Sequence, residues 1–295
     1  TAFGQLRSYF NYFRTGTEKG YHYANPRSFP STLANSFAVE LSNVYSLWGS
    51  STSLATGVTA GLEAIGYAAA AICRGDEDML LAGGLDELND CSQEALERLQ
   101  LVSSSELVQP FSPSRDGTVP GDGIGVILLQ SKEGASADGQ KALAEICGWA
   151  TGTRCYWNGA DSVSKASAVV QRAISEAGIT PDEVEAVFPS ASGTIQGDEF
   201  EARLLQEVFG RRLDSISVYP IKSVTGECFA ASGPLQCLAA VLSLSGKARP
   251  LALSPLNQNH LVPVTRSVAS HSTALVYSAG YDGTFYALVL RKPQE

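Results

Sequence analysis

Short apolar runs alternate with alanine-rich, helix-forming stretches along most of this chain, and this alternation most constrains its fold. Apolar runs bounded by Gly, Pro or polar clusters predict strands, whereas apolar residues spaced three and four apart predict amphipathic helices. The predicted strands are residues 51–56, 78–87, 123–130, 144–153, 186–193, 215–224, 271–280 and 284–292. The strand within residues 78–87 is expected to end in a turn at Gly83 and Gly84. The predicted helices are residues 58–73, 162–178, 199–210 and 233–246. Strands that alternate with helices in this way indicate an α/β protein with mainly parallel sheets.

Two stretches of the sequence repeat one pattern. Residues 53–72 and residues 223–242 each contain a short strand, a Thr-Gly turn, small residues and an alanine-rich helix. Such an echo is typical of a duplicated half-domain, and it predicts two related halves at residues 1–134 and 139–295. The first 50 residues differ from both halves because they are aromatic and rich in Gly, Pro, Asn and Ser. They indicate loops and short helices in a lid or interface region.

Composition argues against several classes of function. The net charge of −9 disfavours nucleic acid and anionic membranes as partners. The six cysteines form no CxxC pair and no Cys/His cluster, so we expect no metal or redox centre. No apolar run is long enough to span a bilayer and no secretory signal is present, so a cytoplasmic protein is expected. The single methionine is Met79 and the chain begins at Thr1, so we expect an N-terminal portion to be missing.

Several motifs resemble those of the β-ketoacyl synthase family. Residues 110–130, PFSPSRDGTVPGDGIGVILLQ, are similar to the family signature RPFDxxRDGFVxGEGAGVLVLE. In the same order, LLAGGLDE at residues 80–87, IKSVTG at 221–226 and GYDGTFYALVL at 280–290 resemble VAGGxDE, IKSxxG and GFGGTNAxLVL. The resemblance implies the thiolase fold, in which two related αβ halves pack as five α-β-α-β-α layers. It also implies that the N-terminal part of the first half is absent from this chain.

The resemblance locates the positions of the family's Cys-His-His catalytic site. Active members use a cysteine at the start of a buried helix to attack an acyl thioester, while two histidines assist decarboxylation and stabilise the enolate. The cysteine position falls on Val58 and the histidine positions fall on Ser192 and Glu227, whereas the lysine of IKSxxG is retained as Lys222. Valine has no lone pair for nucleophilic attack, so the condensing chemistry is expected to be absent. The chain's own histidines lie outside these motifs: His22, His260 and His271.

A scaffold that has lost its catalytic groups resembles the chain length factor, the inactive partner of an active ketosynthase in type II polyketide systems. By this resemblance the chain forms a heterodimer with an active β-ketoacyl synthase through residues 51–55 and shapes the tunnel in which the acyl chain grows. The acyl chain would arrive on the phosphopantetheine arm of an acyl carrier protein, with no cofactor or metal in this chain. Many chain length factors have glutamine at the position of Val58, so a polyene-type system is favoured over an aromatic one. Four bulky apolar side chains would narrow the pocket that holds the active site in catalytic members of the family, or would simply pack in the core. They are Val58, Phe229, Tyr281 and Phe285.

An enzyme with a changed mechanism is the alternative. Ser192, Thr59, Lys222 and Glu227 would then form a thioester-processing acyltransferase or hydrolase site, with Lys222 as the base that activates a serine. A structural role for Lys222 is the competing interpretation, in which its ammonium group pairs with Glu227 or Glu201. An acidic carrier protein would need a basic patch, and the candidates, unless they are solvated surface residues, are Arg115, Arg203, Arg211 and Arg212.

Overall fold

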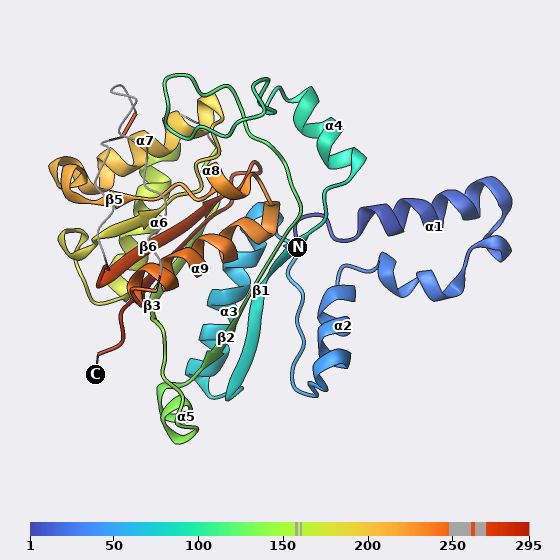
Figure 1. Cartoon of the computed structure of the whole chain (residues 1–295), viewed down its shortest axis with the longest axis horizontal. Helices are drawn as coiled ribbons and strands as arrows, with labels where there is room; N and C mark the ends of the chain where they lie inside the picture. The colour runs from blue at the N-terminus through green and yellow to red at the C-terminus, as the bar shows by residue number, and fades with distance from the viewer. Residues whose placement is uncertain (157–158, 160, 248–260, 263–269, 295) are drawn as a thin grey trace.

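Two β-sheets with helices packed between and beside them form the body of the protein (Figure 1). The computed structural model describes residues 1–156, 159, 161–247, 261–262 and 270–294. The smaller sheet pairs β1 (Met79–Asp86) with β2 (Gly123–Gln130). The larger sheet has the order β3-β7-β6-β4-β5 and contains β3 (Glu145–Gly152), β4 (Ala186–Phe188), β5 (Ser217–Val218), β6 (Thr273–Ala279) and β7 (Phe285–Arg291).

The strand pairing in the described residues is mixed, which corrects the expectation of mainly parallel sheets. β4 is parallel to β5 and β6, whereas β7 is antiparallel to β3 and β6, and β1 is antiparallel to β2. β6 and β7 are joined by residues 280–284 alone, and so short a connection joins only antiparallel neighbours. The α/β class is confirmed, because the parallel strands β4 and β5 are connected through a helix.

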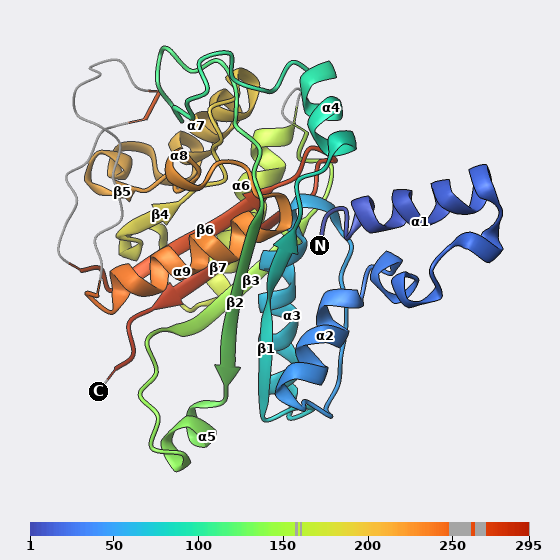
Figure 2. The ribbon, with the colours of Figure 1, turned by 45° about the vertical axis from the view of Figure 1, so that its right-hand side comes forward.

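The helices of the described residues are α1 (Leu6–Lys19), α2 (Ser36–Tyr45), α3 (Ala60–Arg74), α4 (Asp90–Arg98), α5 (Lys132–Ala137), α6 (Ser162–Glu176), α7 (Ile195–Phe209), α8 (Lys222–Thr225) and α9 (Ser232–Leu244). Four of them form two layers, one between the sheets and another outside the larger sheet. Between the sheets, α3 contacts β1 and β7, and α9 contacts β2 and β6 (Figure 2). On the far side of the larger sheet, α6 contacts β3 and β7 and packs beside α7.

The outer face of the β1–β2 sheet is partly open. The described layers are β-α-β-α. A fifth layer would lie on the outer face of the β1–β2 sheet, where the described residues place only α2 and residues 46–54. Side chains on this face are therefore exposed: Met79, Leu81, Ile124 and Leu128.

The strand β7 shows how the two helical layers use one sheet. Alternate residues of a strand point to opposite faces. Phe285 and Val289 pack in the core beneath α6 and α7, whereas Tyr286 and Leu288 pack in the core around α3 and α9. Because helices cover both faces of the sheet, β7 is a continuous apolar run and does not alternate between apolar and polar residues. This apolar run is what predicted a strand at residues 284–292.

The repeated sequence pattern corresponds to a repeated local structure. A 3-10 turn, η4 (Gly57–Thr59), leads directly into α3, and a second 3-10 turn, η7 (Phe229–Ala231), leads directly into α9. Each turn opens with a residue of positive φ, 77° at Gly57 and 50° at Phe229. A bulky aromatic residue rarely adopts this left-handed conformation, so the backbone at Phe229 is strained and must be held by its surroundings.

Three local predictions were wrong. Residues 51–56 are not a strand, because they have no neighbouring strand to pair with within the described chain. Gly83 and Gly84 do not form a turn but lie inside β1, where a Cβ at Gly84 would collide with the Ala230 carbonyl oxygen. The first 50 residues contain a 14-residue helix, α1, in addition to the loops and short helix expected there. The division into halves at 134 and 139 stays a prediction.

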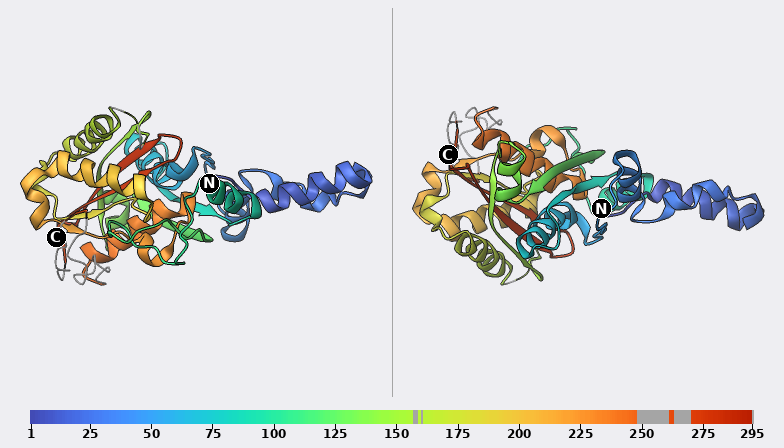
Figure 3. Two further views of the ribbon diagram at one scale, coloured as in Figure 1. Left: turned by 90° about the horizontal axis from the view of Figure 1, so that it is seen from above. Right: turned by 90° about the horizontal axis from the view of Figure 1, so that it is seen from below.

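Within residues 1–48, which we call the N-terminal arm, α1 and the turns that follow it project from the body (Figure 3). The base of the arm is held by Asp86 at the end of β1. Its carboxylate accepts hydrogen bonds from the Thr1 hydroxyl at 2.6 Å, the Ala2 N–H at 2.8 Å and the Phe3 N–H at 3.1 Å. Just beyond, Arg7 forms an ion pair with Glu87 at 3.0 Å.

Replacing Gly84 with alanine tests the close packing of β1 on η7. The added Cβ would overlap the Ala230 carbonyl oxygen and lie 2.9 Å from the Gly61 Cα, and neither backbone atom can move aside easily. We expect the free energy of unfolding, measured by urea denaturation, to fall by about 2–3 kcal/mol or more. Gly121→Ala is the matched control, since its Cβ would have only the Thr225 carbonyl oxygen at 3.9 Å. Equal losses in the two variants would contradict this account.

Candidate functional site

Most of the positions singled out from the sequence gather where α3 and α9 begin. Val58 in η4 and Phe229 in η7 are buried in one apolar cluster, against which Tyr281 packs from the loop between β6 and β7. The structure therefore brings together three of the four predicted tunnel residues. Phe285 lies elsewhere, stacked on Tyr277 in the core beneath α6 and α7 with 5.3 Å between ring centres. A role of these residues in lining a tunnel stays a prediction.

Glu227 is surrounded by hydrogen-bond donors. Its Oε1 accepts hydrogen bonds from the Phe229 N–H at 2.9 Å and the Ser232 hydroxyl at 3.0 Å. Its Oε2 accepts from the Lys222 ammonium at 2.7 Å and the Tyr281 hydroxyl at 3.2 Å. A carboxylate has about four lone-pair positions, so these donors saturate it. A carboxylate paired in this way accepts hydrogen bonds and donates none, which is the reverse of what stabilising an enolate oxygen requires.

Lys222 lies at the start of α8 and is almost fully buried, with a side chain that is 2% exposed against 1% for Glu227. Its ammonium contacts Glu227 at 2.7 Å and the Ser190 hydroxyl at 3.3 Å. The expected structural pair is therefore formed, and Glu227 rather than Glu201 is the hydrogen-bonded partner. Two opposite charges can be buried together because each replaces the water that the other has lost, whereas either one alone would be costly.

Ser192 does not form the nucleophile–base pair that a changed enzyme would need. Its N–H donates to Asp198 at 3.2 Å, and its hydroxyl lies 3.5 Å from the Thr194 hydroxyl. Lys222 contacts Ser190 instead, two residues earlier, and its ammonium has no lone pair with which to take a proton. The proximity of Ser190 to Lys222 was missed from the sequence because neither motif spacing nor periodicity marks it.

Two further carboxyl groups, Asp198 and Glu201, are buried on the first turns of α7. Asp198 accepts hydrogen bonds from the N–H groups of Phe111, Ser192 and Gly193 at 2.6, 3.2 and 3.2 Å. Burial outweighs these bonds and raises the pKa of Asp198 to about 6. Burial and the nearby charge of Asp198 raise the pKa of Glu201 to about 8, against the opposing effect of Lys222. The charge of Asp198 affects the pKa of Glu201 because both carboxyl groups are buried. The amphipathic sequence pattern of α7 did not indicate this burial.

Two further cysteines have raised thiol pKa values. Cys228 directly follows Glu227, and burial together with the Glu227 charge raises the pKa of its thiol to about 11. The thiol donates to the carbonyl oxygens of Asp122 and Thr225. Cys147 lies on β3, and burial also raises its pKa. A raised pKa disfavours the thiolate form, which is the nucleophilic form of a cysteine.

In the part of the chain that the structure describes, His, Cys, Asp and Glu side chains form no group of three or more that could hold a metal ion. Among the same residues, no helix combines the length and the apolar character needed to cross a membrane.

Breaking the buried ion pair should be far more costly than removing it whole. In Lys222→Met the Glu227 carboxylate stays buried without its cation, so we expect the free energy of unfolding to fall by about 3–5 kcal/mol. The double variant Lys222→Met/Glu227→Gln should regain part of that loss, because no unpaired charge remains. The measurement is a double-mutant cycle by urea denaturation.

Arg98→Met is the matched control for this cycle. Arg98 forms an ion pair with Glu94 at 2.6 Å, but both side chains are exposed. Its stability should stay close to that of the wild type, because exposed ion pairs contribute little. A Lys222→Met variant as stable as Arg98→Met would contradict the structural role of the pair.

Stability should fall with rising pH because of Glu201. Its pKa is raised from 4.5 to about 8, so between these values the folded protein retains a proton that the unfolded chain has lost. The contribution to stability is complete below the lower value and is lost as pH rises through the higher one, with a slope of at most about 1.4 kcal/mol per pH unit. Glu201→Gln should flatten this slope between pH 6 and 8, whereas Glu207→Gln, exposed on the same helix, should not. Parallel pH profiles for the wild type and Glu201→Gln would refute the assignment.

Comparisons with known proteins agree with this architecture. Residues 6–135 match the family described as "Beta-ketoacyl synthase, N-terminal domain", and residues 143–254 match "Beta-ketoacyl synthase, C-terminal domain". The chain is 30% identical over 290 residues to 3-oxoacyl-[acyl-carrier-protein] synthase 2 of Vibrio cholerae, covering 93% of this chain and 70% of that protein. It is 26% identical over 285 residues to a putative polyketide beta-ketoacyl synthase 1 of Streptomyces virginiae, covering 93% and 68%.

Solved structures show the same fold. The ishigamide ketosynthase/chain length factor superposes with a TM-score of 0.89 at 20% identity, covering all of this chain and 74% of that one. A type II polyketide synthase acyl carrier protein in complex with its ketosynthase gives a TM-score of 0.88 at 24% identity, covering 98% and 75%. The expected thiolase-like ketosynthase fold is confirmed, and the chain belongs to the β-ketoacyl synthase family.

Proposed function

We propose that this chain is a non-catalytic, chain-length-factor-type subunit that dimerises with an active β-ketoacyl synthase in type II polyketide or polyene biosynthesis. The observation that carries the proposal is the replacement of all three catalytic positions, with Glu227 saturated by Lys222 and its other donors. The relatives are named as synthases. The proposal distinguishes this chain from them because its residues at the three catalytic positions differ from the Cys-His-His set of active members.

The chemistry of condensation supports this reading. An active site must form an acyl-enzyme through a thiolate, then stabilise the enolate left when the malonyl unit loses CO₂. Val58 supplies no nucleophile, and the thiol of Cys228, next to Glu227, has a raised pKa. Glu227, which forms an ion pair with Lys222, stands at the position of an enolate-stabilising hydrogen-bond donor. Its carboxylate only accepts hydrogen bonds.

The apolar cluster suggests what the subunit contributes instead. This cluster, made of Val58, Phe229 and Tyr281, forms an apolar wall. The Tyr281 hydroxyl donates to Glu227, so an acyl chain against the wall would meet no charge. We infer that this wall limits the growing chain, which an acyl carrier protein presents on its phosphopantetheine arm to the active partner. A thioester-processing acyltransferase or hydrolase, the alternative, has lost its geometric basis because Ser192 does not contact Lys222.

The first test is assembly and turnover with the ketosynthase encoded beside this chain. Size-exclusion chromatography with mass determination should show a one-to-one complex, and the complex should elongate malonyl units. This chain alone should not hydrolyse acyl thioesters, because Val58 stands at the position of the nucleophile. It should not decarboxylate malonyl carrier protein either, because Ser192 and Glu227 stand at the positions of the two histidines. The control is the complex whose ketosynthase subunit has its own nucleophilic cysteine replaced by alanine, which should be inactive.

Three results would count against the proposal. They are thioester turnover by this chain alone, elongation that persists in the control complex, and failure of the two proteins to associate. The Val58→Cys variant should remain inactive alone, since Ser192 and Glu227 still stand at the histidine positions.

A further inference from the structure

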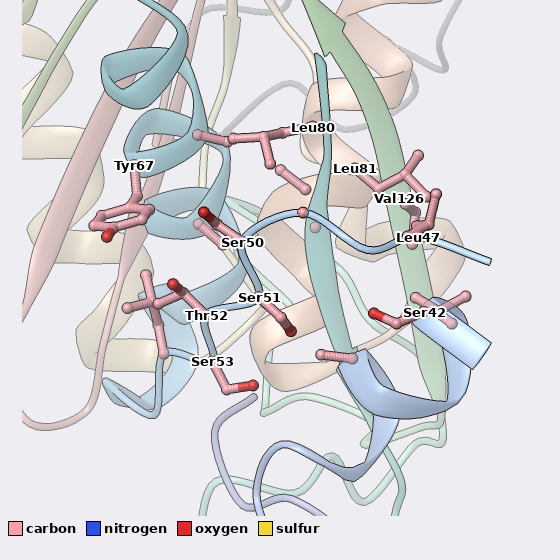
Figure 4. Close-up of a pocket in the computed structure, with 18 of the residues that line it drawn as sticks. Ser42, Leu47, Ser50, Ser51, Thr52, Ser53, Tyr67, Leu80, Leu81 and Val126 are labelled. Atoms are coloured by element: carbon pink, nitrogen blue, oxygen red, sulfur yellow. The ribbon is translucent and has the colours of Figure 1, made fainter. Parts of the chain in front are cut away.

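The apolar wall of Val58, Phe229 and Tyr281 contains one side chain with a polar end, that of Tyr281. Val58 and Phe229 lie in the turns that open α3 and α9, whereas Tyr281 lies in the loop between β6 and β7. None of the three lines the groove of about 520 Å³ that is bordered by residues 46–54, α3 and β1 (Figure 4). The position of the wall therefore depends on contacts of its own.

The loop that carries Tyr281 is short and contains two glycines. It comprises residues 280–284, and Gly283 in it has a φ of 83°, a left-handed conformation that glycine adopts readily. The loop is tied to the turn before α3, since the Thr284 hydroxyl lies 3.2 Å from the Thr59 hydroxyl. A tie at Thr284 constrains the loop backbone, whereas the ring of Tyr281 is placed by its own side-chain torsions.

The Tyr281 hydroxyl supplies a second tie, from the loop to the segment before α9. It donates to Glu227 Oε2 at 3.2 Å. Burial, together with the charge and the hydrogen bond of Glu227, raises the pKa of the Tyr281 hydroxyl well above its usual value. The phenol therefore keeps its proton at neutral pH and remains a donor. A hydrogen bond to an ionised acceptor is about twice as strong as one between neutral groups, so this tie is a firm one.

Glu227 is a fixed acceptor for this hydrogen bond. Its backbone is bonded on both sides, through its N–H to the Val119 carbonyl and through its carbonyl to the Gly121 N–H. The oxygen that accepts from Tyr281, Oε2, also accepts from the Lys222 ammonium at 2.7 Å. These two donors occupy both lone pairs of that oxygen, so the carboxylate has one preferred orientation. The Tyr281 ring is thereby held at a set distance from a rigid part of the fold.

We propose that Glu227 is a positioning residue of the wall: its carboxylate holds the Tyr281 hydroxyl and so fixes how far the Tyr281 ring reaches toward the growing acyl chain. This effect on chain length rests on the proposed function, because a wall limits a chain only where a chain meets it. The hydrogen bond between the two residues and its hold on the loop at residues 280–284 do not rest on that function.

Tyr281→Phe tests the hold on the loop, because it removes the hydroxyl and keeps the ring. In this chain alone, amide hydrogen exchange at residues 280–284 should become about tenfold faster or more, as expected when a hydrogen bond to a charged group is lost. The matched control is Tyr219→Phe, which removes a buried hydroxyl that lies 2.9 Å from His271 Nε2 in the core around α3 and α9. The control should leave exchange of the loop unchanged. Equal exchange of the loop in the wild type and Tyr281→Phe would overturn the inference.

The double variant Lys222→Met/Glu227→Gln tests the same bond from its other end. The Phe229 N–H and the Ser232 hydroxyl, which donate to Oε1, should keep the amide oxygen at position 227 on their side. The amide NH₂ group then faces the Tyr281 hydroxyl, and the charged acceptor is gone. Exchange of the loop should rise, and adding Tyr281→Phe should raise it little further, because both changes remove one interaction. Fully additive effects would show that residues 227 and 281 act independently and would overturn the inference.

The effect on chain length is measured in the complex with the ketosynthase, by mass spectrometry of the products. Tyr281→Phe should give longer products at an unchanged rate of malonyl consumption, whereas Tyr219→Phe should keep the wild-type lengths. A merely structural role would lower the yield of the complex without changing product length. If the wild-type complex elongates and Tyr281→Phe leaves the lengths unchanged, the positioning role is wrong while the proposed function stands. If the wild-type complex does not elongate, the proposed function and the effect on chain length fail together, and exchange in the chain alone still decides whether Glu227 holds Tyr281.

Discussion

The close approach of the Ala230 backbone to two glycines determines much of this structure. A Cβ atom added at either Gly61 or Gly84 would collide with the Ala230 carbonyl oxygen. The Ala230 N–H donates to Asp86 at 2.9 Å. Only glycine lets the start of α9 lie so near both the start of α3 and the strand β1. This contact brings the turns η4 and η7 together, so the side chains of Val58 and Phe229 meet although they are far apart in sequence.

The same framework makes the buried ion pair possible. The Glu227 backbone is fixed on both sides, since its N–H donates to the Val119 carbonyl at 2.8 Å and its carbonyl accepts from the Gly121 N–H at 2.9 Å. Its carboxylate is thereby held between the first N–H of η7 and the Lys222 ammonium. The pair carries no net charge, and Glu201 nearby has a pKa of about 8, so Glu201 is mostly uncharged beside the pair at neutral pH.

The sequence predicted those parts of the fold that depend on local pattern. The long helices α3, α6, α7 and α9 and the strands β2, β3, β6 and β7 follow from periodicity, and the resemblance to the synthases placed Val58, Ser192 and Glu227 within their motifs. Gly83 and Gly84 were misread as a turn because their reason lies in contacts with distant segments, namely Val126, Gly125 and Ala230. The direction of strand pairing and the coupling of Asp198 with Glu201 likewise depend on tertiary structure, which no local window contains.

The motifs that shape the backbone have physical requirements different from those of the positions at which the family resemblance places its catalytic residues. Gly61 and Gly84 admit no side chain because backbone atoms occupy that space. Val58 requires only an apolar group of suitable size, whereas an acidic residue at position 227 requires a compensating cation, which Lys222 provides. Residues 58 and 227 can therefore change type while the fold is kept, as long as the first stays apolar and the buried charge of the second keeps its partner.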